Sequence, residues 1–411
     1  MQEYGYIRGT LSGLNEEVMN IYSRIDSEIS GIEQEITGLR RDFHKHPELG
    51  LQEVRTSGII ASYLDGLGLE VQRGVAETGV TGLLTGSAPG RTIMLRADMD
   101  GLPVMEKNDC PYRSINDGVM HACGHDGHMA ILLGAAKVLS RLRDSFKGQV
   151  KFVFQPAEEK PGGARNMIEQ GVLENPKVDA AFGLHLVTAL PTGMTAVCKG
   201  IMMAAMDSFS LIIKGKGGHS AMPQGSIDAI QGACRVIDAL HGLTTKDISS
   251  LDRTLVNIGT IRGGTAANVV ADEVELTGTV RNLNPDKRKA CPQVIKETAM
   301  QALLESGASG ELIYEDGYPP VVNDPLMTDF LADVIRETAW GKHLIDMPPV
   351  MGSEDMSFYL ERVPGCFFFL GAGNQERGLT NPLHSADFDF DEAALAIGAS
   401  IFARLAVSFL R

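Results

Sequence analysis

The 411-residue sequence has no cluster of Lys and Arg, and its formal net charge is -15. A surface with this balance is poorly suited to neutralising nucleic-acid phosphates or anionic lipid headgroups. We therefore expect no nucleic-acid and no membrane partner. Low-complexity segments and internal repeats are also missing, and a hydrophobic content of 44% with 22% charged residues is ordinary for a globular protein.

Cysteine is scarce and irregularly spaced, with six residues in the whole chain, unlike a small secreted disulfide scaffold. The first residues, "MQEYGYIRGTLSGLNEEVM", have no continuous apolar core and do not predict a signal peptide. The apolar run "AALAIGASIFARLAVSFL" contains Arg404 and two serines, which favours a buried amphipathic helix over a membrane span. These features predict a cytoplasmic protein in a reducing compartment.

Hydrophobic periodicity predicts an α/β fold. Apolar residues recur at spacings of three and four up to about residue 45, which is typical of helix; they are Leu14, Val18, Ile21, Ile25, Ile29, Ile32 and Ile36. Strand-like "RTIMLRADMD", "QVKFVFQPAEE" and "DAAFGLHL" then alternate with helix-like segments. This alternation predicts a mostly parallel sheet flanked by helices.

The rhythm changes near residue 205 to strand, helix, strand, strand, helix, strand, the order of a ferredoxin-like βαββαβ unit. The larger pattern resumes with "CFFFLGAG" and the C-terminal helix, so the first domain is discontinuous. The predicted division is an N-terminal helical extension (1–37), a first catalytic segment (38–204), an inserted domain (205–317) and a second catalytic segment (318–411).

The stretch "HACGHDGHM", residues 121–129, holds three histidines and a cysteine. A metal site, a cysteine nucleophile with a histidine base, and a redox pair all fit it. Cys123 and His125 are two positions apart, so on an extended loop both can face one ion. A structural zinc site would supply a second Cys or His pair nearby, and none follows.

Other ligand-type residues lie at later strand ends, namely Glu158 and Glu159 in "QPAEE", His185 in "FGLHL" and His384 in "NPLHSADF". Open α/β sheets bind ligands at the carboxyl ends of strands. Mixed S, N and O donors favour an open catalytic metal site, in which one carboxylate holds a cation and another takes a proton from water. Five such ligands exceed the needs of one tetrahedral ion and suggest two ions about 3.5 to 4 Å apart.

Each residue also has a simpler interpretation by itself: a small buried cysteine, a solvated acidic loop, or histidines bonded in the core. The cysteine-nucleophile hypothesis gives "QPAEE", His185 and His384 no role. Only the ordered set favours the metal hypothesis.

Eight stretches, in order, resemble the metal-dependent amidohydrolase branch of the aminoacylase and carboxypeptidase superfamily, which includes hippurate hydrolases, N-acyl-amino-acid amidohydrolases and auxin-conjugate hydrolases. They are "LRADMDGLPV", "MHACGHDGHMA", "FVFQPAEEKPGGARNMI", "GLHL", "GKGGHSAMP", "NVVADEVELTGTVR", "GSEDMSFY" and "LHSADFDFDE". The resemblance runs from about residue 38 to the C-terminus. It implies a catalytic domain and a smaller domain that dimerises and acts as a lid.

By position, the resemblance implies two divalent ions (Zn, Mn, Co or Ni) held by Cys123, His125, Glu159, His185 and His384. Cys123 would bridge the ions and Glu158 would be the general base. His219 in "GGHSA" resembles the lid residue that stabilises the oxyanion, often from the partner subunit. Asn268 in "AANVV" resembles the lid residue that helps to hold the substrate.

Two positions depart from the wider pattern. Asp98 stands in "DMDGLP" where many superfamily members have a metal-binding His, and His125 would replace that ligand. The second departure is Gln224, which follows Pro223 where a histidine is common. The expected enzyme is a homodimer that cleaves N-acyl amino acids or small peptides. A carboxypeptidase or dipeptidase of the same superfamily, a cysteine-nucleophile hydrolase and a non-catalytic binding protein are the alternatives.

Overall fold

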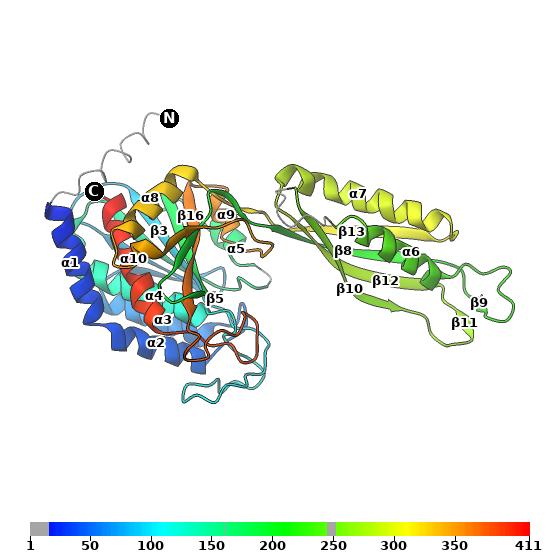
Figure 1. The fold of residues 1–411 in the computed structure, drawn as a ribbon, viewed down its shortest axis with the longest axis horizontal. Coiled ribbons are helices and arrows are strands. Elements are labelled where there is room, and N and C mark those ends of the chain that lie inside the picture. The colour runs from blue at the N-terminus through cyan, green and yellow to red at the C-terminus, as the bar shows by residue number, and fades with distance from the viewer. Residues whose placement is uncertain (1–15, 161, 245–251) are drawn as a thin grey trace. The chain divides into compact units, whose positions relative to one another are not determined.

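The computed structural model describes residues 16–160, 162–244 and 252–411, which fall into two compact units (Figure 1). We call them the large unit (Met1–Gly200, Asn323–Met347 and Phe358–Arg411) and the small unit (Ile201–Val322 and Pro348–Ser357). The large unit is therefore assembled from separate stretches of sequence on either side of the small unit.

The amphipathic N-terminal segment forms two helices, α1 (Glu16–Ser30) and α2 (Glu33–Lys45). The expected apolar residues from Ile21 to Ile36 are buried in the core of the large unit, while Leu14 lies outside the described residues. The break between the helices includes Gly31, a residue type that weakens helix.

An eight-stranded sheet forms the centre of the large unit in the order β1-β2-β4-β3-β5-β16-β6-β15. The strands are β1 (Glu70–Val75), β2 (Gly79–Thr85), β3 (Thr92–Asp98), β4 (Gln149–Gln155), β5 (Ala180–Pro191), β6 (Thr195–Val197), β15 (Leu344–Asp346) and β16 (Gly365–Gly373). The central β4, β3, β5 and β16 run parallel, whereas β2 and β6 are antiparallel to β4 and β16. The predicted α/β class with a mostly parallel sheet is confirmed.

Helices cover this sheet because its central strands are buried along their whole length, as every residue of β3 and β16 is. Helices α4 (His125–Arg141) and α10 (Ala393–Phe409) pack on β3 and on each other, with α2 against α4 and α1 against α10. The other helices of this unit are α3 (Val54–Gly66), α5 (Ala164–Glu169), α8 (Pro325–Arg336) and the short α9 (Ser357–Leu360).

The apolar C-terminal run forms α10, which is almost entirely buried. Its one charged residue, Arg404, lies 2.6 Å from Asp26 of α1 and so keeps a partner. In the part of the chain that is described, no helix combines the length and the hydropathy that crossing a membrane requires.

The small unit has a four-stranded antiparallel sheet in the order β10-β12-β8-β13. Its elements are β8 (Ala205–Lys214), β9 (Gly218–His219), α6 (Ala229–His241), β10 (Thr254–Gly263), β11 (Val269–Val270), β12 (Glu273–Asn282), α7 (Pro285–Leu304) and β13 (Ser309–Tyr318). Buried residues alternate along β8 and β12, so one face packs on α6 and α7 (Figure 1). The predicted βαββαβ order is confirmed. Strands β7 (Gly200–Met203) and β14 (Val321–Asn323) form a separate pair.

A buried ionic network fastens α2 to the first turn of α4. The Arg40 guanidinium is fully buried and lies 2.7 Å from Asp126 and 2.7 Å from Asp389. Asp126 also lies 2.8 Å from Nδ1 of the buried His44. Because buried charges need partners, each group in this network depends on the others.

Arg40→Met should lower the free energy of unfolding by roughly 3–5 kcal/mol, because it removes the buried guanidinium that pairs with both Asp126 and Asp389. Arg41 supplies a matched control, since its exposed guanidinium pairs with Glu392 at 2.6 Å. Arg41→Met should cost at most about 1 kcal/mol. Urea denaturation of both variants measures the difference, and equal losses would contradict the role of the network.

Candidate metal centre

Polar side chains gather where parallel strands of the large unit end. In the register of the sheet, Asp98 at the end of β3 pairs with Gln155 at the end of β4, and Arg96 pairs with Gly183 of β5. The residues that follow β4 and the later part of β5 therefore share one edge with Asp98. Cys123 lies two residues before the start of α4, in the same cluster as His185 of β5.

The six residues predicted for this site in the large unit are brought together. Overlapping groups have donor atoms within 4.8 Å of one another: Cys123 with His125 and His185, Cys123 with Glu159 and His384, and His125 with Glu158 and Glu159. Cys123 Sγ lies 3.4 Å from His185 Nε2, close to the roughly 3.5 Å expected between two tetrahedral zinc ligands. Because Cys123 belongs to two groups, the arrangement can hold two cations that share its sulfur.

His384 reaches the cluster from the loop between β16 and α10. Its backbone N–H donates to the carbonyl of Ala122 at 2.7 Å, next to Cys123. Its ring Nε2 lies 2.9 Å from Glu159 Oε1. The backbone of His384 is in the left-handed region, with φ of 66°, a conformation that non-glycine residues keep only where the surroundings enforce it.

His125 and His185 are both oriented through Nδ1. His125 Nδ1 lies 2.9 Å from the carbonyl oxygen of Asp100, and His185 Nδ1 lies 2.7 Å from that of Leu186. Donation to a carbonyl places the proton on Nδ1, so that Nε2 of the neutral ring offers a lone pair. His125 Nε2 is buried without a hydrogen-bond partner. An orphaned buried nitrogen among thiol and carboxylate donors fits a metal ligand.

The carboxylates of the cluster create a negative potential that favours bound cations. Burial disfavours a charged imidazole, yet Asp98, Asp100 and Glu159 outweigh it and raise the pKa of His125 to about 10. Burial, together with Glu159, Glu158 and Asp98, holds the pKa of the Cys123 thiol well above its usual range. Burial, with the neighbouring His128, lowers the pKa of His185 to about 3 and keeps that ring neutral, as a ligand must be. A cation would neutralise the excess of carboxylates.

Two aspartates form hydrogen bonds within and beside this cluster, and sequence reasoning gave them no role. Asp100 Oδ1 accepts the N–H of Glu158 and Oδ2 that of Glu159, each at 3.0 Å. Asp98 lies 2.6 Å from His128 Nδ1, and His128 Nε2 accepts the N–H of Leu186 at 2.9 Å. The run "DMDGLP" after a buried strand could have indicated them, because Asp98 and Asp100 are two positions apart and such residues face the same way on an extended chain.

The two remaining predicted residues lie together in the small unit. His219 belongs to β9 and pairs with Val269 of β11, and the Ser220 N–H donates to the carbonyl of Asn268 at 3.1 Å. Both His219 and Asn268 are exposed. His219 Nδ1 accepts the N–H of Ala221 at 3.0 Å, so Nε2 carries the proton and can donate.

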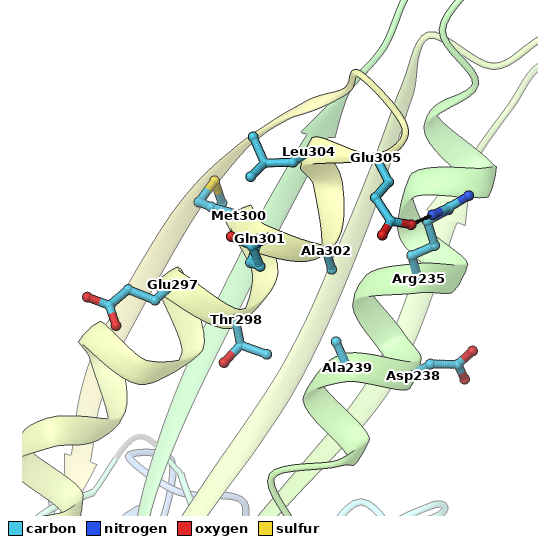
Figure 2. Close-up of a pocket in the computed structure, with 10 residues that line it drawn as sticks. All are labelled: Arg235, Asp238, Ala239, Glu297, Thr298, Met300, Gln301, Ala302, Leu304 and Glu305. Carbon is cyan, nitrogen blue, oxygen red and sulfur yellow. Dashed lines mark hydrogen bonds and ion pairs between the residues drawn. The ribbon is translucent and has the colours of Figure 1, made fainter.

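A groove between α6 and α7 of the small unit has different chemistry. Figure 2 shows the residues that line it, with Arg235 of α6 paired with Glu305 just beyond α7. Its lining residues include carboxylates but no His or Cys. The groove therefore lacks the mixed donors that the cluster in the large unit offers.

Residues 94–408 match the sequence signature of Peptidase family M20/M25/M40. The chain belongs to this family. It is 39% identical over 395 residues to thermostable carboxypeptidase 1 of Saccharolobus solfataricus, covering 95% of this chain and 99% of that protein. It is 38% identical over 376 residues to N-acetylcysteine deacetylase of Bacillus subtilis, covering 91% and 97%.

Among solved structures, a Bacillus subtilis dinuclear metal-binding peptidase of the M20 family aligns with a TM-score of 0.81 and 34% identity, over 93% of this chain and 99% of that one. The family resemblance indicated by the eight motifs is confirmed. In this M20 chain the roles of the individual site residues stay predictions.

Cys123→Ser should lower metal content, because it replaces the sulfur that two donor groups share. We expect about two divalent ions per chain in the native protein after repletion and desalting, and clearly fewer in the variant. Cys234→Ser, at an exposed position of α6, is the control and should keep the native content. Equal metal content in all three proteins would argue against Cys123 as a shared ligand.

Proposed function

We propose that this M20 protein hydrolyses the amide bond of an N-acyl amino acid, or of a related small conjugate, with two divalent cations per chain. The observation that carries the proposal is the place of Glu158, whose carboxylate lies within 4.8 Å of donor atoms of His125 and Glu159. A carboxylate beside a metal site can act as a general base toward water. The deacetylase activity in the name of the relative from Bacillus subtilis supports the substrate class.

Cys123, His125, Glu159, His185 and His384 would hold the two ions, with Cys123 as the shared ligand. Zn, Mn, Co and Ni all suit this mixture of donors. When bound, the ions polarise the scissile carbonyl and acidify the attacking water. Asp100 would keep His125, Glu158 and Glu159 in place through the contacts described above.

Glu158 would take a proton from water as the oxygen attacks the carbonyl carbon, and would return it to the leaving nitrogen as the C–N bond breaks. The products are a carboxylate and a free amino acid. His219 would donate a hydrogen bond from Nε2 to the oxyanion, and Asn268 would hold the carboxylate or carbonyl of the substrate.

Hydrolysis of a peptide from its carboxyl end is the second candidate, favoured by the relative named a carboxypeptidase. A panel of N-acetyl amino acids, N-benzoylglycine, N-blocked dipeptides and free dipeptides separates the two. The cysteine-nucleophile hypothesis is disfavoured, because nucleophilic thiols have lowered pKa values, whereas burial and neighbouring carboxylates raise the pKa of Cys123.

Glu158→Gln should lower kcat on the order of 10²- to 10⁴-fold while metal content stays native, because the amide cannot take the proton of water. Turnover and metal content are measured on the same preparation. Parallel loss of metal would give Glu158 a structural role, and native turnover would remove it from the mechanism.

We also propose a homodimer formed through the small unit. Strand β10 is an edge of its sheet, and Ile261 on that strand is exposed; such edges pair readily with another chain.

A cytoplasmic location is proposed as well, in keeping with six free cysteines.

If His219 acts on the site of the partner subunit, Glu158→Gln and His219→Ala proteins should complement each other. Each variant by itself should be nearly inactive, with His219→Ala losing roughly 10²- to 10³-fold in kcat. After mixing and subunit exchange, heterodimers contain one site with both Glu158 and His219. Activity that does not recover in exchanged dimers would place His219 on the site of its own subunit or outside it.

A further inference from the structure

The turn that carries Glu158 and Glu159 is held through three consecutive backbone N–H groups. The N–H of Ala157 donates to Glu53 Oε1 at 2.9 Å, and those of Glu158 and Glu159 donate to Asp100. Ala157 has a φ of 52°, in the left-handed region. A non-glycine residue keeps this conformation only when its surroundings fix it.

Glu53 has no other evident reason to be buried. It stands at the N-cap of α3, yet its side chain makes no capping bond and is 0% exposed. Burial raises the pKa of Glu53 to about 7, against the effect of the hydrogen bonds it accepts from Thr78 and Ala157. An acid that is costly to bury and contacts the catalytic turn is a candidate for a positioning role.

Thr78 completes the arrangement. Its hydroxyl donates to Glu53 Oε2 at 2.6 Å and is itself nearly buried. The loop that carries Glu53 also approaches the turn at Gly50, where an added Cβ would lie 2.9 Å from the Cβ of Ala157. The turn thus rests on the loop before α3, which precedes the residues that match the family signature.

We propose that Glu53, oriented by Thr78, is a positioning residue that holds the Ala157 N–H and thereby fixes the directions of Glu158 and Glu159. The proposal rests on the function proposed above, because it assigns Glu158 the role of general base. Glu53 belongs to none of the donor groups of the candidate metal centre and acts through the Ala157 N–H.

The test compares Glu53→Ala and Glu53→Gln in the metal-replete full chain. Glu53→Ala leaves the Ala157 N–H unpaired and should lower kcat on the order of 10- to 100-fold with little change in KM, because it displaces the base and touches no substrate. Glu53→Gln should recover most of the native kcat. Its amide oxygen can accept from Ala157, and its NH₂ group can donate to the Thr78 hydroxyl.

Glu48 provides a matched control from the same segment. Its carboxylate accepts the N–H groups of Arg55 and Thr56 at 3.0 and 2.9 Å and so caps α3. Glu48→Ala should lower thermal stability but leave kcat native. An equal fall in kcat for Glu48→Ala, a native kcat for Glu53→Ala, or no recovery in Glu53→Gln would each overturn the proposal.

Thr78→Val covers the case in which Glu53→Ala does not fold. It removes only the hydroxyl, so a lowered kcat supports the positioning role and a native kcat overturns it.

If the native protein hydrolyses none of the substrates, the proposed function fails by itself. Amide hydrogen exchange over residues 157–159 then decides: faster exchange in Glu53→Ala, but not in Glu48→Ala, supports the positioning role, and unchanged exchange overturns it.

Discussion

Carboxylates crowded at the ends of β3 and β4 are the constraint on which the rest of the site depends. Asp98, Asp100, Glu158 and Glu159 meet there beside buried imidazoles and a buried thiol. Without a cation this crowding raises the pKa of both His125 and Cys123. A protein interior holds so many like charges only with countercharge or hydrogen bonds, and divalent ions supply the former.

The scaffold supplies the hydrogen bonds. Asp100 contacts His125 through its carbonyl oxygen and accepts the N–H groups of Glu158 and Glu159 through its carboxylate, so one residue links the loop after β3, the start of α4 and the turn after β4. The Arg40 network also holds the start of α4, through Asp126 next to His125. Hydrogen bonds of this kind from neighbouring residues keep the geometry of a site fixed.

The central strands and the order of the small unit could be predicted because their apolar patterns are long and regular. Strands β1, β2 and β15 were not foreseen. Their segments are short or contain glycine, as at Gly74 and Gly82, and their pairing depends on neighbours far away in sequence. The break between α1 and α2 at Gly31 was not foreseen either, because the apolar spacing continues across it. The positioning contacts of Glu53 and Asp100 were missed for a related reason: a sequence gives an acid's place in the chain but not the N–H group that it reaches.

Motifs such as "HACGHDGHM" and "QPAEE" are local, so they are enough to identify the kinds of donor atom, their order along the chain and the family. Which donors can share a cation site, and which backbone groups hold them, depends on the folded chain. Cys123, Glu159, His185 and His384 come from separate loops and strands, and the hydrogen-bonded register of a parallel sheet brings them within a few ångströms. Metal coordination depends on such distances, and spacing along the chain does not contain them.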